Sequence, residues 1–230
     1  MTLPWVETFL SIQGEGPRTG RRCAFIRFGG CNLSCSWCDS AYTWDSTRFD
    51  LRTEITSLTI DQIMGTLPDV DEVVLTGGEP LMHQNNPDWA VLLRTLSSRS
   101  IFIAVETNGT IAPNPTTQTF VGHYSISPKL ANAGTHKRGQ SPQLAAWPQT
   151  MKVRNTCLKI VVANAQEVQD AARLADRAGW PRWATWVMPE GTTVPAILSN
   201  FREITEEALT QGLNVSQRVH VFAFGDERGT

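Results

Sequence analysis

The sequence lacks the segments that mark membrane, secreted and repeat proteins. No continuous apolar run approaches the about 20 residues that a membrane-spanning helix needs. The first 14 residues have no basic stretch leading into an apolar core, so no secretory signal peptide is predicted. No internal repeat or low-complexity tract stands out. These absences predict a cytoplasmic protein without a membrane partner.

The sequence also lacks an excess of charge of either sign. Lys and Arg total 20 and Asp and Glu total 22, which gives a formal net charge of −2. This balance does not favour electrostatic binding to nucleic acid or to an anionic membrane. The chain has 230 residues, of which 41% are hydrophobic. That length and composition predict one domain over residues 1–230 with a sizeable core.

Cysteine is scarce, but three of the five cysteines lie together. Cys31, Cys35 and Cys38 form a C-x3-C-x2-C motif, whereas Cys23 and Cys157 stand apart. Clustered cysteines in a non-secreted chain favour metal or redox chemistry over disulfides. Thiolates suit iron–sulfur clusters, zinc or copper. A cubane cluster usually takes four cysteines, so three would leave one iron open to an outside ligand. A structural zinc site remains the alternative, although none of the four histidines has a characteristic spacing.

Strand and helix patterns alternate along most of the chain. Strands are predicted at residues 5–12, 22–28, 72–76, 101–105, 124–127, 158–162, 184–188 and 218–224, and helices at 59–67, 87–97, 165–178 and 194–211. Residues 39–57 show no convincing helix, and residues 130–150 read as a long loop of the functional or mobile kind. This order predicts an α/β fold with a mainly parallel sheet and right-handed crossovers.

Unusual polar residues follow the strands of this predicted sheet. Arg27, Thr76, Glu106 and Ser127 each lie at or just past the carboxyl end of a strand, where α/β folds bind ligands. We therefore expect them to meet at one rim, together with the cysteine loop. Arg27 sits in an apolar strand, so it either forms a structural ion pair or binds an anion. Lys159 is a second charge in an apolar strand, and the sequence assigns it no role.

A second motif, Thr76-Gly77-Gly78-Glu79-Pro80, follows a predicted strand. Its glycines let the backbone approach a ligand closely. The Gly-Gly-Glu-Pro element and the cysteine triad together resemble the radical S-adenosylmethionine (SAM) superfamily. The resemblance implies a [4Fe-4S] cluster on the three cysteines, with SAM chelating the open iron and Glu79 accepting a hydrogen bond from the SAM ammonium.

A closer resemblance is to the 7-carboxy-7-deazaguanine synthase (QueE) family. It rests on Gln13-Gly14-Glu15-Gly16, Arg27 before Gly-Gly-Cys, Cys38-Asp39 followed by a hydroxyl residue, Thr76-Gly-Gly-Glu-Pro, Glu106-Thr-Asn-Gly and Ser127-Pro128-Lys129. This resemblance implies an abridged (β/α) radical SAM partial barrel. It also implies conversion of 6-carboxy-5,6,7,8-tetrahydropterin to 7-carboxy-7-deazaguanine and ammonia, in queuosine-type 7-deazapurine biosynthesis. The 5′-deoxyadenosyl radical performs the chemistry, so no catalytic side chain is expected.

The resemblance also implies the site residues and partners. Substrate contacts are expected from Ile12, Gln13, Gly14, Glu15, Arg27 and Thr76, SAM contacts from Gly78, Glu79, Ser127, Pro128 and Lys129, and cluster ligands from Cys31, Cys35 and Cys38. Ser40 stands where the family usually has Thr; its hydroxyl is the expected Mg²⁺ ligand. The implied partners are an electron donor such as flavodoxin or ferredoxin and a second copy of the chain in a homodimer.

Two other readings of the motifs remain open. Another small radical SAM enzyme, such as a glycyl-radical activase, shares the cysteine spacing but does not predict the Gln-Gly-Glu-Gly turn, Arg27 or the Mg²⁺ site. A non-catalytic metal-binding module would be a colourless zinc protein that does not cleave SAM.

Overall fold

The computed structural model describes residues 2–136, 142, 144–147, 151 and 155–230. The strands are β1 (Leu3–Ile12), β2 (Arg22–Phe28), β3 (Thr56–Leu58), β4 (Glu72–Gly77), β5 (Phe102–Thr107), β6 (His123–Ile126), β7 (Thr156–Val162), β8 (Thr185–Pro189) and β9 (Asn214–Val215). The helices are α1 (Leu51–Glu54), α2 (Ile60–Gly65), α3 (Pro87–Ser98), α4 (Pro115–Phe120), α6 (Ala165–Ala178), α7 (Val194–Ser199), α8 (Phe201–Gln211) and α9 (Val219–Phe224). Short 3-10 helices occupy Gly16–Arg18, Ala41–Thr43, Pro80–His83, Ala131–Ala133, Leu144–Ala146 and Arg182–Ala184.

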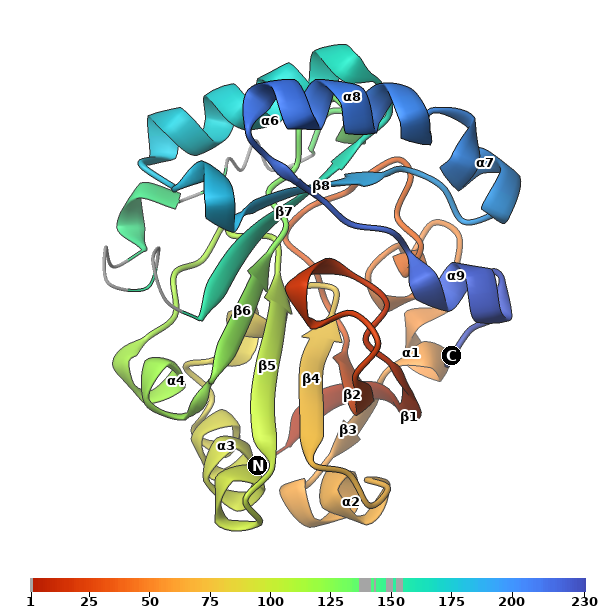
Figure 1. The fold of residues 1–230 in the computed structure, drawn as a ribbon. Helices are drawn as coiled ribbons and strands as arrows, with labels where there is room; N and C mark the ends of the chain where they lie inside the picture. The colour runs from red at the N-terminus through yellow and green to blue at the C-terminus, as the bar shows by residue number, and fades with distance from the viewer. Residues whose placement is uncertain (1, 137–141, 143, 148–150, 152–154) are drawn as a thin grey trace.

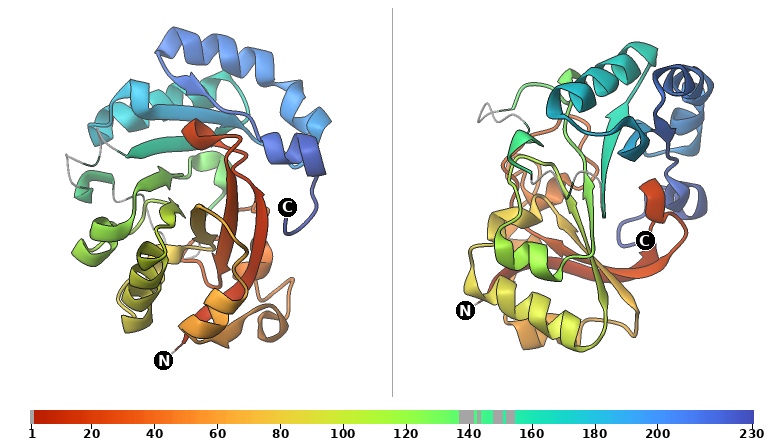
Figure 2. Two further views of the ribbon diagram at one scale, coloured as in Figure 1. Left: turned by 60° about the horizontal axis from the view of Figure 1, so that its bottom comes forward. Right: turned by 60° about the vertical axis from the view of Figure 1, so that its left-hand side comes forward.

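The strands of the described residues form one curved sheet with helices on its outer side (Figures 1 and 2). Their order is β3-β1-β2-β4-β5-β6-β7-β8-β9. β1 runs antiparallel to β2 and β3, and each adjacent pair from β2 to β9 is parallel. The predicted mainly parallel α/β fold is therefore confirmed.

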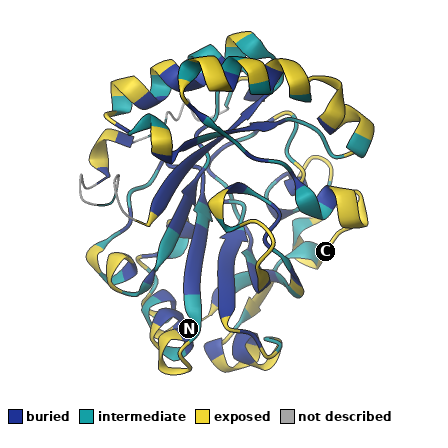
Figure 3. Cartoon of the chain, viewed as in Figure 1, coloured by how far each residue is buried: buried dark blue, intermediate teal, exposed yellow. Residues whose placement is uncertain are grey.

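The two faces of the sheet have different roles. On β2, Ala24, Ile26 and Phe28 point outward into the main hydrophobic core, which also contains the buried faces of the helices. Cys23 and Phe25 point inward into a smaller apolar cluster. Figure 3 shows the strands largely buried and the outer helix faces exposed. The inner face therefore has an apolar floor, and polar side chains lie beyond it toward the strand ends.

Helix ends follow the capping rules where the sequence carries the signal. Thr59 caps α2 and forms a reciprocal capping box with Gln62. Helix α6 begins after Asn164, which caps it, and ends at Gly179 in the left-handed region with a φ of 64°. Both helices were predicted within two residues at each end, because their terminal signals are local.

The structure corrects the prediction for residues 39–57. This segment contains the 3-10 turn Ala41–Thr43 and the four-residue helix α1, which Asp50 caps by accepting a hydrogen bond from the Arg52 backbone N–H. Strand β3 follows and pairs with the start of β1. Elements this short carry too few residues for a periodic apolar pattern to reveal them.

The prediction of a single helix over residues 194–211 is also corrected. The chain forms α7 and α8, separated by Asn200 with φ −113° and ψ 4°. The Asn200 side chain donates a hydrogen bond of 2.8 Å to the carbonyl of Ala163, at the end of β7. This tertiary contact breaks the helix at a residue whose amide bonds readily to backbone.

The predicted last strand at residues 218–224 is wrong. Helix α9 occupies this segment, and the strand that pairs with β8 is the two-residue β9 just before it. The β-branched and aromatic residues of the segment favour a strand, but strand propensity depends strongly on context. Here Gly212 ends α8 in the left-handed region, so the chain reaches the edge of the sheet at Asn214, four residues earlier than predicted.

The turn between β1 and β2 lies across the inner face of the sheet (Figure 1). Arg18 of this turn forms a two-bond ion pair with Glu72 at the start of β4, with contacts of 2.7 and 2.5 Å. The Arg18 guanidinium also stacks on the ring of Phe102. The turn thus closes the amino-terminal end of the partial barrel and leaves the carboxyl end open.

Among the described residues, no helix is both long and apolar enough to cross a membrane. The predicted loop 130–150 lies partly outside the described residues. Its described parts include the two 3-10 turns Ala131–Ala133 and Leu144–Ala146.

Candidate active site

A cavity of about 670 Å3 lies on the inner face of the sheet, at the carboxyl ends of the parallel strands. Its wall includes Arg27, Thr76, Glu106 and Ser127, which come from four separate segments. These are the four residues that the sequence placed at one rim, and the structure brings them together. The cavity therefore lies where α/β folds bind ligands.

The cysteine loop forms another wall of this cavity. Cys31, Cys35 and Cys38 all line it. The loop begins at Gly30, whose φ of 89° lies in the left-handed region. Gly78 packs directly against it: a Cβ at Gly78 would lie 2.1 Å from the Gly30 carbonyl oxygen. Only glycine fits this contact, which joins the two sequence motifs into one site.

Hydrogen-bond donors approach two of the cysteine sulfurs. The Leu33 backbone N–H donates to Cys31 Sγ at 3.4 Å, and the Trp44 indole N–H donates to Cys38 Sγ at 3.3 Å. Burial raises the pKa of the Cys31 thiol to about 12, so ligation by a metal must displace its proton. Three thiols on one cavity, two of them facing N–H donors, fit an iron–sulfur cluster with an open position.

A closed single-ion site is not present among the described residues. They contain no group of three or more His, Cys, Asp or Glu side chains placed to hold one metal ion. Cys23 and Cys157 are free and buried, and neither lines the cavity. The separation of these two cysteines from the motif agrees with their spacing in the sequence.

Glu79 lies behind the cavity wall. Its side chain is 0% exposed and accepts hydrogen bonds from the Leu81 N–H at 2.9 Å, the Thr107 hydroxyl at 2.8 Å and the Asn108 N–H at 2.7 Å. Burial raises the pKa of the Glu79 carboxyl to about 7, against the opposing effect of these donors. In this structure Glu79 ties the end of β4 to the end of β5, and its contact with SAM stays a prediction.

Of the other residues expected to contact SAM, some line the cavity and one does not. Gly78, Ser127 and Lys129 line the cavity, whereas Pro128 is not part of its wall. The Lys129 ammonium donates to the Ser127 hydroxyl at 2.9 Å and lies 5.2 Å from the ring centre of Trp37. This contact places a positive charge beside the cysteine loop.

The turn after β1 supplies another part of the cavity wall. Ile12, Gln13, Gly14 and Glu15 all line the cavity. Gln13 is held from both sides of its amide, because Nε2 donates to Glu106 at 3.2 Å and Oε1 accepts from the Glu15 N–H at 3.0 Å. The turn therefore presents a fixed edge to the cavity.

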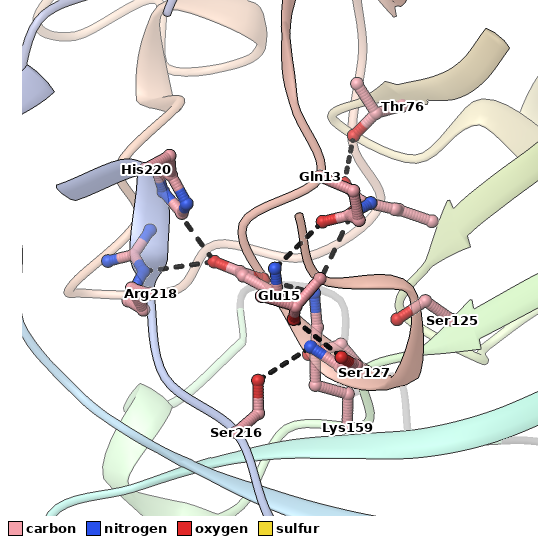
Figure 4. A network of polar contacts seen from close by, with 12 residues as sticks. Gln13, Glu15, Thr76, Ser125, Ser127, Lys159, Ser216, Arg218 and His220 are labelled. Atoms are coloured by element: carbon pink, nitrogen blue, oxygen red, sulfur yellow. Dashed lines mark hydrogen bonds and ion pairs between the residues drawn. The ribbon is translucent and has the colours of Figure 1, made fainter. Parts of the chain in front are cut away.

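Glu15 is the centre of a buried charge network (Figure 4). It accepts from the Lys159 ammonium and, at 3.0 Å, from Nε of Arg218. Lys159 also lies 3.7 Å from Glu106. Burial alone raises the pKa of Glu15, but the charges of Lys159 and Arg218 hold it well below its usual range. Lys159, which the sequence left without a role, therefore serves as a counter-ion inside the barrel.

Arg27 forms the structural ion pair considered for it, and anion binding by Arg27 stays a prediction. Its Nε donates to the Glu7 carboxylate at 2.7 Å, so the structural ion pair exists. The side chain also lines the cavity and is 17% exposed. Thr76 lies beside it in register on the neighbouring strand and donates to Glu106 at 2.9 Å.

Ser40, the expected Mg²⁺ ligand, lines the cavity next to the cysteine loop. Its hydroxyl lies 3.8 Å from Cys38 Sγ. Asp39, which precedes it, accepts from Nη2 of Arg218. Asp39 therefore links the segment that contains Ser40 to Arg218, the residue before α9.

Several cavity residues escaped the sequence analysis. Arg218, His220 and the tail from Gly225 to Thr230 line the cavity, as does Asp39. Arg218 and His220 were hidden because their segment was read as a strand. His220 packs so closely on Gly14 that a Cβ there would meet its ring. The one sequence signal for Arg218 and His220 was that they are polar residues in an otherwise apolar segment.

Comparison with known proteins gives consistent similarities. Residues 25–204 match the Radical SAM superfamily. A 7-carboxy-7-deazaguanine synthase from Pyrobaculum aerophilum is 36% identical over 97% of this chain and 96% of that protein. The synthase from Hyperthermus butylicus is 32% identical over 94% and 90%, respectively. The fold is similar to the crystal structure of QueE from Escherichia coli, with a TM-score of 0.69, 24% identity and coverage of 96% and 95%.

Proposed function

The chain belongs to the 7-carboxy-7-deazaguanine synthase family of the radical SAM superfamily, and from this premise we propose that its cavity converts 6-carboxy-5,6,7,8-tetrahydropterin to 7-carboxy-7-deazaguanine and ammonia. One observation carries the proposal. The three cysteines of the motif and the charged strand-end residues, among them Arg27 and Glu106, line a single cavity. A site for generating a radical and a site for binding a polar, carboxylated substrate would thus share one space.

The cysteine side of the cavity is assigned to the cofactors. Cys31, Cys35 and Cys38 would hold the [4Fe-4S] cluster, and Gly78, Glu79, Ser127, Pro128 and Lys129 would contact SAM. When bound, the cluster would supply the electron for reductive cleavage of SAM. The tight contact of Gly78 with Gly30 supports this assignment, because it leaves backbone rather than side chain facing the space next to the cysteines.

The opposite side of the cavity is assigned to the pterin. Arg27 would bind its carboxylate through a planar fork. Ile12, Gln13 and Gly14 would face its ring through the backbone of the turn, and Thr76 would line its edge. Glu15 would accept from the guanidine-like edge of the pterin, since each carboxylate oxygen has a second lone pair beyond the one used by Lys159 or Arg218.

Mg²⁺ is assigned to Ser40. One hydroxyl is a sparse site, so the ion would keep several waters and take further oxygens from the substrate. Turnover against Mg²⁺ concentration tests this assignment. Ser40→Ala should need more Mg²⁺, whereas Ser40→Thr should be tolerated because it keeps the hydroxyl. Superimposable curves for wild type and Ser40→Ala would remove Ser40 from the metal site, and SAM cleavage without substrate should survive both changes.

The assembly and setting of the enzyme belong to the same proposal. The chain would act as one domain in a homodimer in the cytoplasm and receive electrons from flavodoxin or ferredoxin. Sedimentation of the reconstituted enzyme tests the dimer, and turnover with each purified donor in place of a chemical reductant tests the electron source.

An anaerobic turnover assay tests the function itself. The reconstituted enzyme is incubated with SAM, reductant, Mg²⁺ and 6-carboxytetrahydropterin, and the product is identified by mass spectrometry. The proposal requires a brown protein that forms 7-carboxy-7-deazaguanine while SAM is not consumed in stoichiometric amounts. SAM cleavage without this product would point to another radical SAM reaction, and a colourless zinc protein would overturn the radical mechanism.

A further inference from the structure

The carboxylate of Glu7, on β1, joins three parts of the cavity wall. Its Oε1 accepts from Nε of Arg27 at 2.7 Å and from the Tyr42 hydroxyl at 2.8 Å. Its Oε2 accepts from Nε of Arg228 at 3.0 Å. The Glu7 side chain is 16% exposed. A half-buried carboxylate with three donors from a strand, a 3-10 turn and the C-terminal tail is a junction between these elements.

A β-bulge places Glu7 at this junction. Trp5 pairs with Phe28 and Glu7 with Arg27, so β1 advances two residues while β2 advances one. Without this shift Val6 would lie opposite Arg27. Bulges re-aim side chains in this way and are frequent beside active sites. The local strand geometry therefore brings a charged residue to the position that an apolar one would take.

The geometry of the Arg27 contact leaves the outer end of its guanidinium available. Glu7 accepts the hydrogen bond from Nε of Arg27. Among the described residues, none accepts a hydrogen bond from either Nη group. The guanidinium carbon lies 5.5 Å from the ring centre of Phe9 and 5.9 Å from that of Tyr42. Arg27 is thus held at its base and flanked by rings, with its terminal fork in a cavity that fits a carboxylate.

The same carboxylate fastens the C-terminal tail. Arg228 donates to Glu7 and, through Nη1, to Glu54 of α1 at 2.8 Å. Its guanidinium carbon also lies 3.9 Å from the ring centre of Tyr42. The residues on both sides of Arg228 line the cavity. The tail is therefore held against the cavity by Arg228, with one attachment to Glu7 and one to Glu54.

We propose that Glu7 is a positioning residue that aims Arg27 at the carboxylate of the substrate and anchors the C-terminal tail over the same cavity. The substrate part of this inference rests on the proposed function, and the tail part does not. Because the Glu7 carboxylate pairs with both Arg27 and Arg228, removing its charge should weaken the alignment of Arg27 and the attachment of the tail together.

The first test measures binding without turnover. The anaerobic, SAM-loaded holoenzyme with oxidised cluster is titrated calorimetrically with 6-carboxytetrahydropterin. Glu7→Gln should raise the Kd about tenfold, the scale of losing one charge-assisted hydrogen bond. Glu54→Gln is the matched control: it removes the other partner of Arg228 and should keep the wild-type Kd, because Arg27 retains its own partner.

The second test follows the tail and needs no substrate. Trypsin can cleave after Arg228, and mass spectrometry detects cleavage of the bond between Arg228 and Gly229. Local opening governs such cleavage. Glu7→Gln and Glu54→Gln should each speed it relative to wild type, and both changes together should speed it further.

The outcomes separate this inference from the proposed function. Failure of the wild-type enzyme to bind the pterin overturns the proposed function, while the proteolysis still reports on the tail. An unchanged Kd in Glu7→Gln, or an equal loss in Glu54→Gln, overturns the positioning role. If Glu7→Gln does not fold, Tyr42→Phe removes one donor to the same oxygen and should raise the Kd by a smaller factor; no change in this variant also overturns the role.

Discussion

At the scale of single residues, the charges of the barrel interior depend on their partners. Lys159 and Glu15 are each nearly enclosed, with side chains 5% and 13% exposed, and they are paired with one another. Arg27 differs from them because its terminal nitrogens face the cavity. Removing one partner of a buried ion pair is costly, whereas the unpaired donors of Arg27 are open to the ligand proposed above.

Arg27→Lys should weaken pterin binding by roughly 1.5–3 kcal/mol, because a point charge cannot replace the planar fork. Lysine can still pair with Glu7, so the change tests the outer end of the side chain alone. Calorimetric titration of the SAM-loaded enzyme measures the loss. Equal affinity in the variant and the wild type would leave Arg27 with its structural role only.

At the scale of elements, the shape of the cysteine loop depends on two glycine-containing segments that pack against each other. Gly30 opens the loop in the left-handed region, and Gly78 gives it room. The loop then aims three thiols into the cavity, although burial raises the pKa of Cys31 and Cys35 in the free protein. The loop is therefore shaped for a ligand that takes the place of the thiol protons.

Alanine at any one of Cys31, Cys35 or Cys38 should abolish the cluster absorption and SAM cleavage. Cys23→Ala and Cys157→Ala should retain both, since these two cysteines are buried and do not themselves line the cavity. Anaerobic reconstitution with an iron count on all five variants checks this. Loss of the cluster in Cys157→Ala but not in Cys35→Ala would refute the assignment of ligands.

Arg218, the residue before helix α9, connects this helix to the wall of the site. Arg218 binds Glu15 of the β1–β2 turn and Asp39 of the cysteine loop, and its side chain is 11% exposed. Arg218→Gln should lower the free energy of unfolding by about 3 kcal/mol, because it breaks a buried pair while Lys159 still compensates Glu15. Urea denaturation measures the change.

Arg202→Gln provides the control for this measurement. Arg202 forms a pair with Glu206 on the surface of α8, and its side chain is 92% exposed. Its loss should change the free energy of unfolding by no more than about 0.5 kcal/mol. Equal effects of the two substitutions would show that the Arg218 network adds nothing beyond a surface pair.

At the scale of the whole molecule, the paired carboxylates of Glu7 and Glu15 contribute to the dependence of stability on pH. Burial raises the pKa of Glu7 and Glu15, but the neighbouring cations outweigh it and hold both pKa values below normal. Such groups stabilise the fold above the unfolded pKa of about 4.3 and lose that contribution as the pH falls below it. Tm should therefore drop on acidification from about pH 5 to pH 3. Glu15→Gln should have a shallower dependence, and an equal slope would contradict the role of Glu15.

The sequence by itself determined the features that depend on neighbours along the chain. The cysteine spacing and the Gly-Gly-Glu-Pro turn indicated the radical SAM superfamily, and the alternating order of strands and helices indicated the parallel sheet. Thr59 as an N-cap and Gly179 after the last turn marked helix ends, because a cap is decided within one turn of the helix.

Only the tertiary structure decided how distant charges pair. Glu15 meets Lys159 and Arg218 across 144 and 203 residues, and no local pattern records such contacts. It also decided the bulge that turns Glu7 toward Arg27, and it made residues 219–224 a helix against their composition. The physical reason is the same in each case. Closure of the sheet into a partial barrel fixes which side chains share the buried interior, and charges confined there must pair with whatever closure brings near.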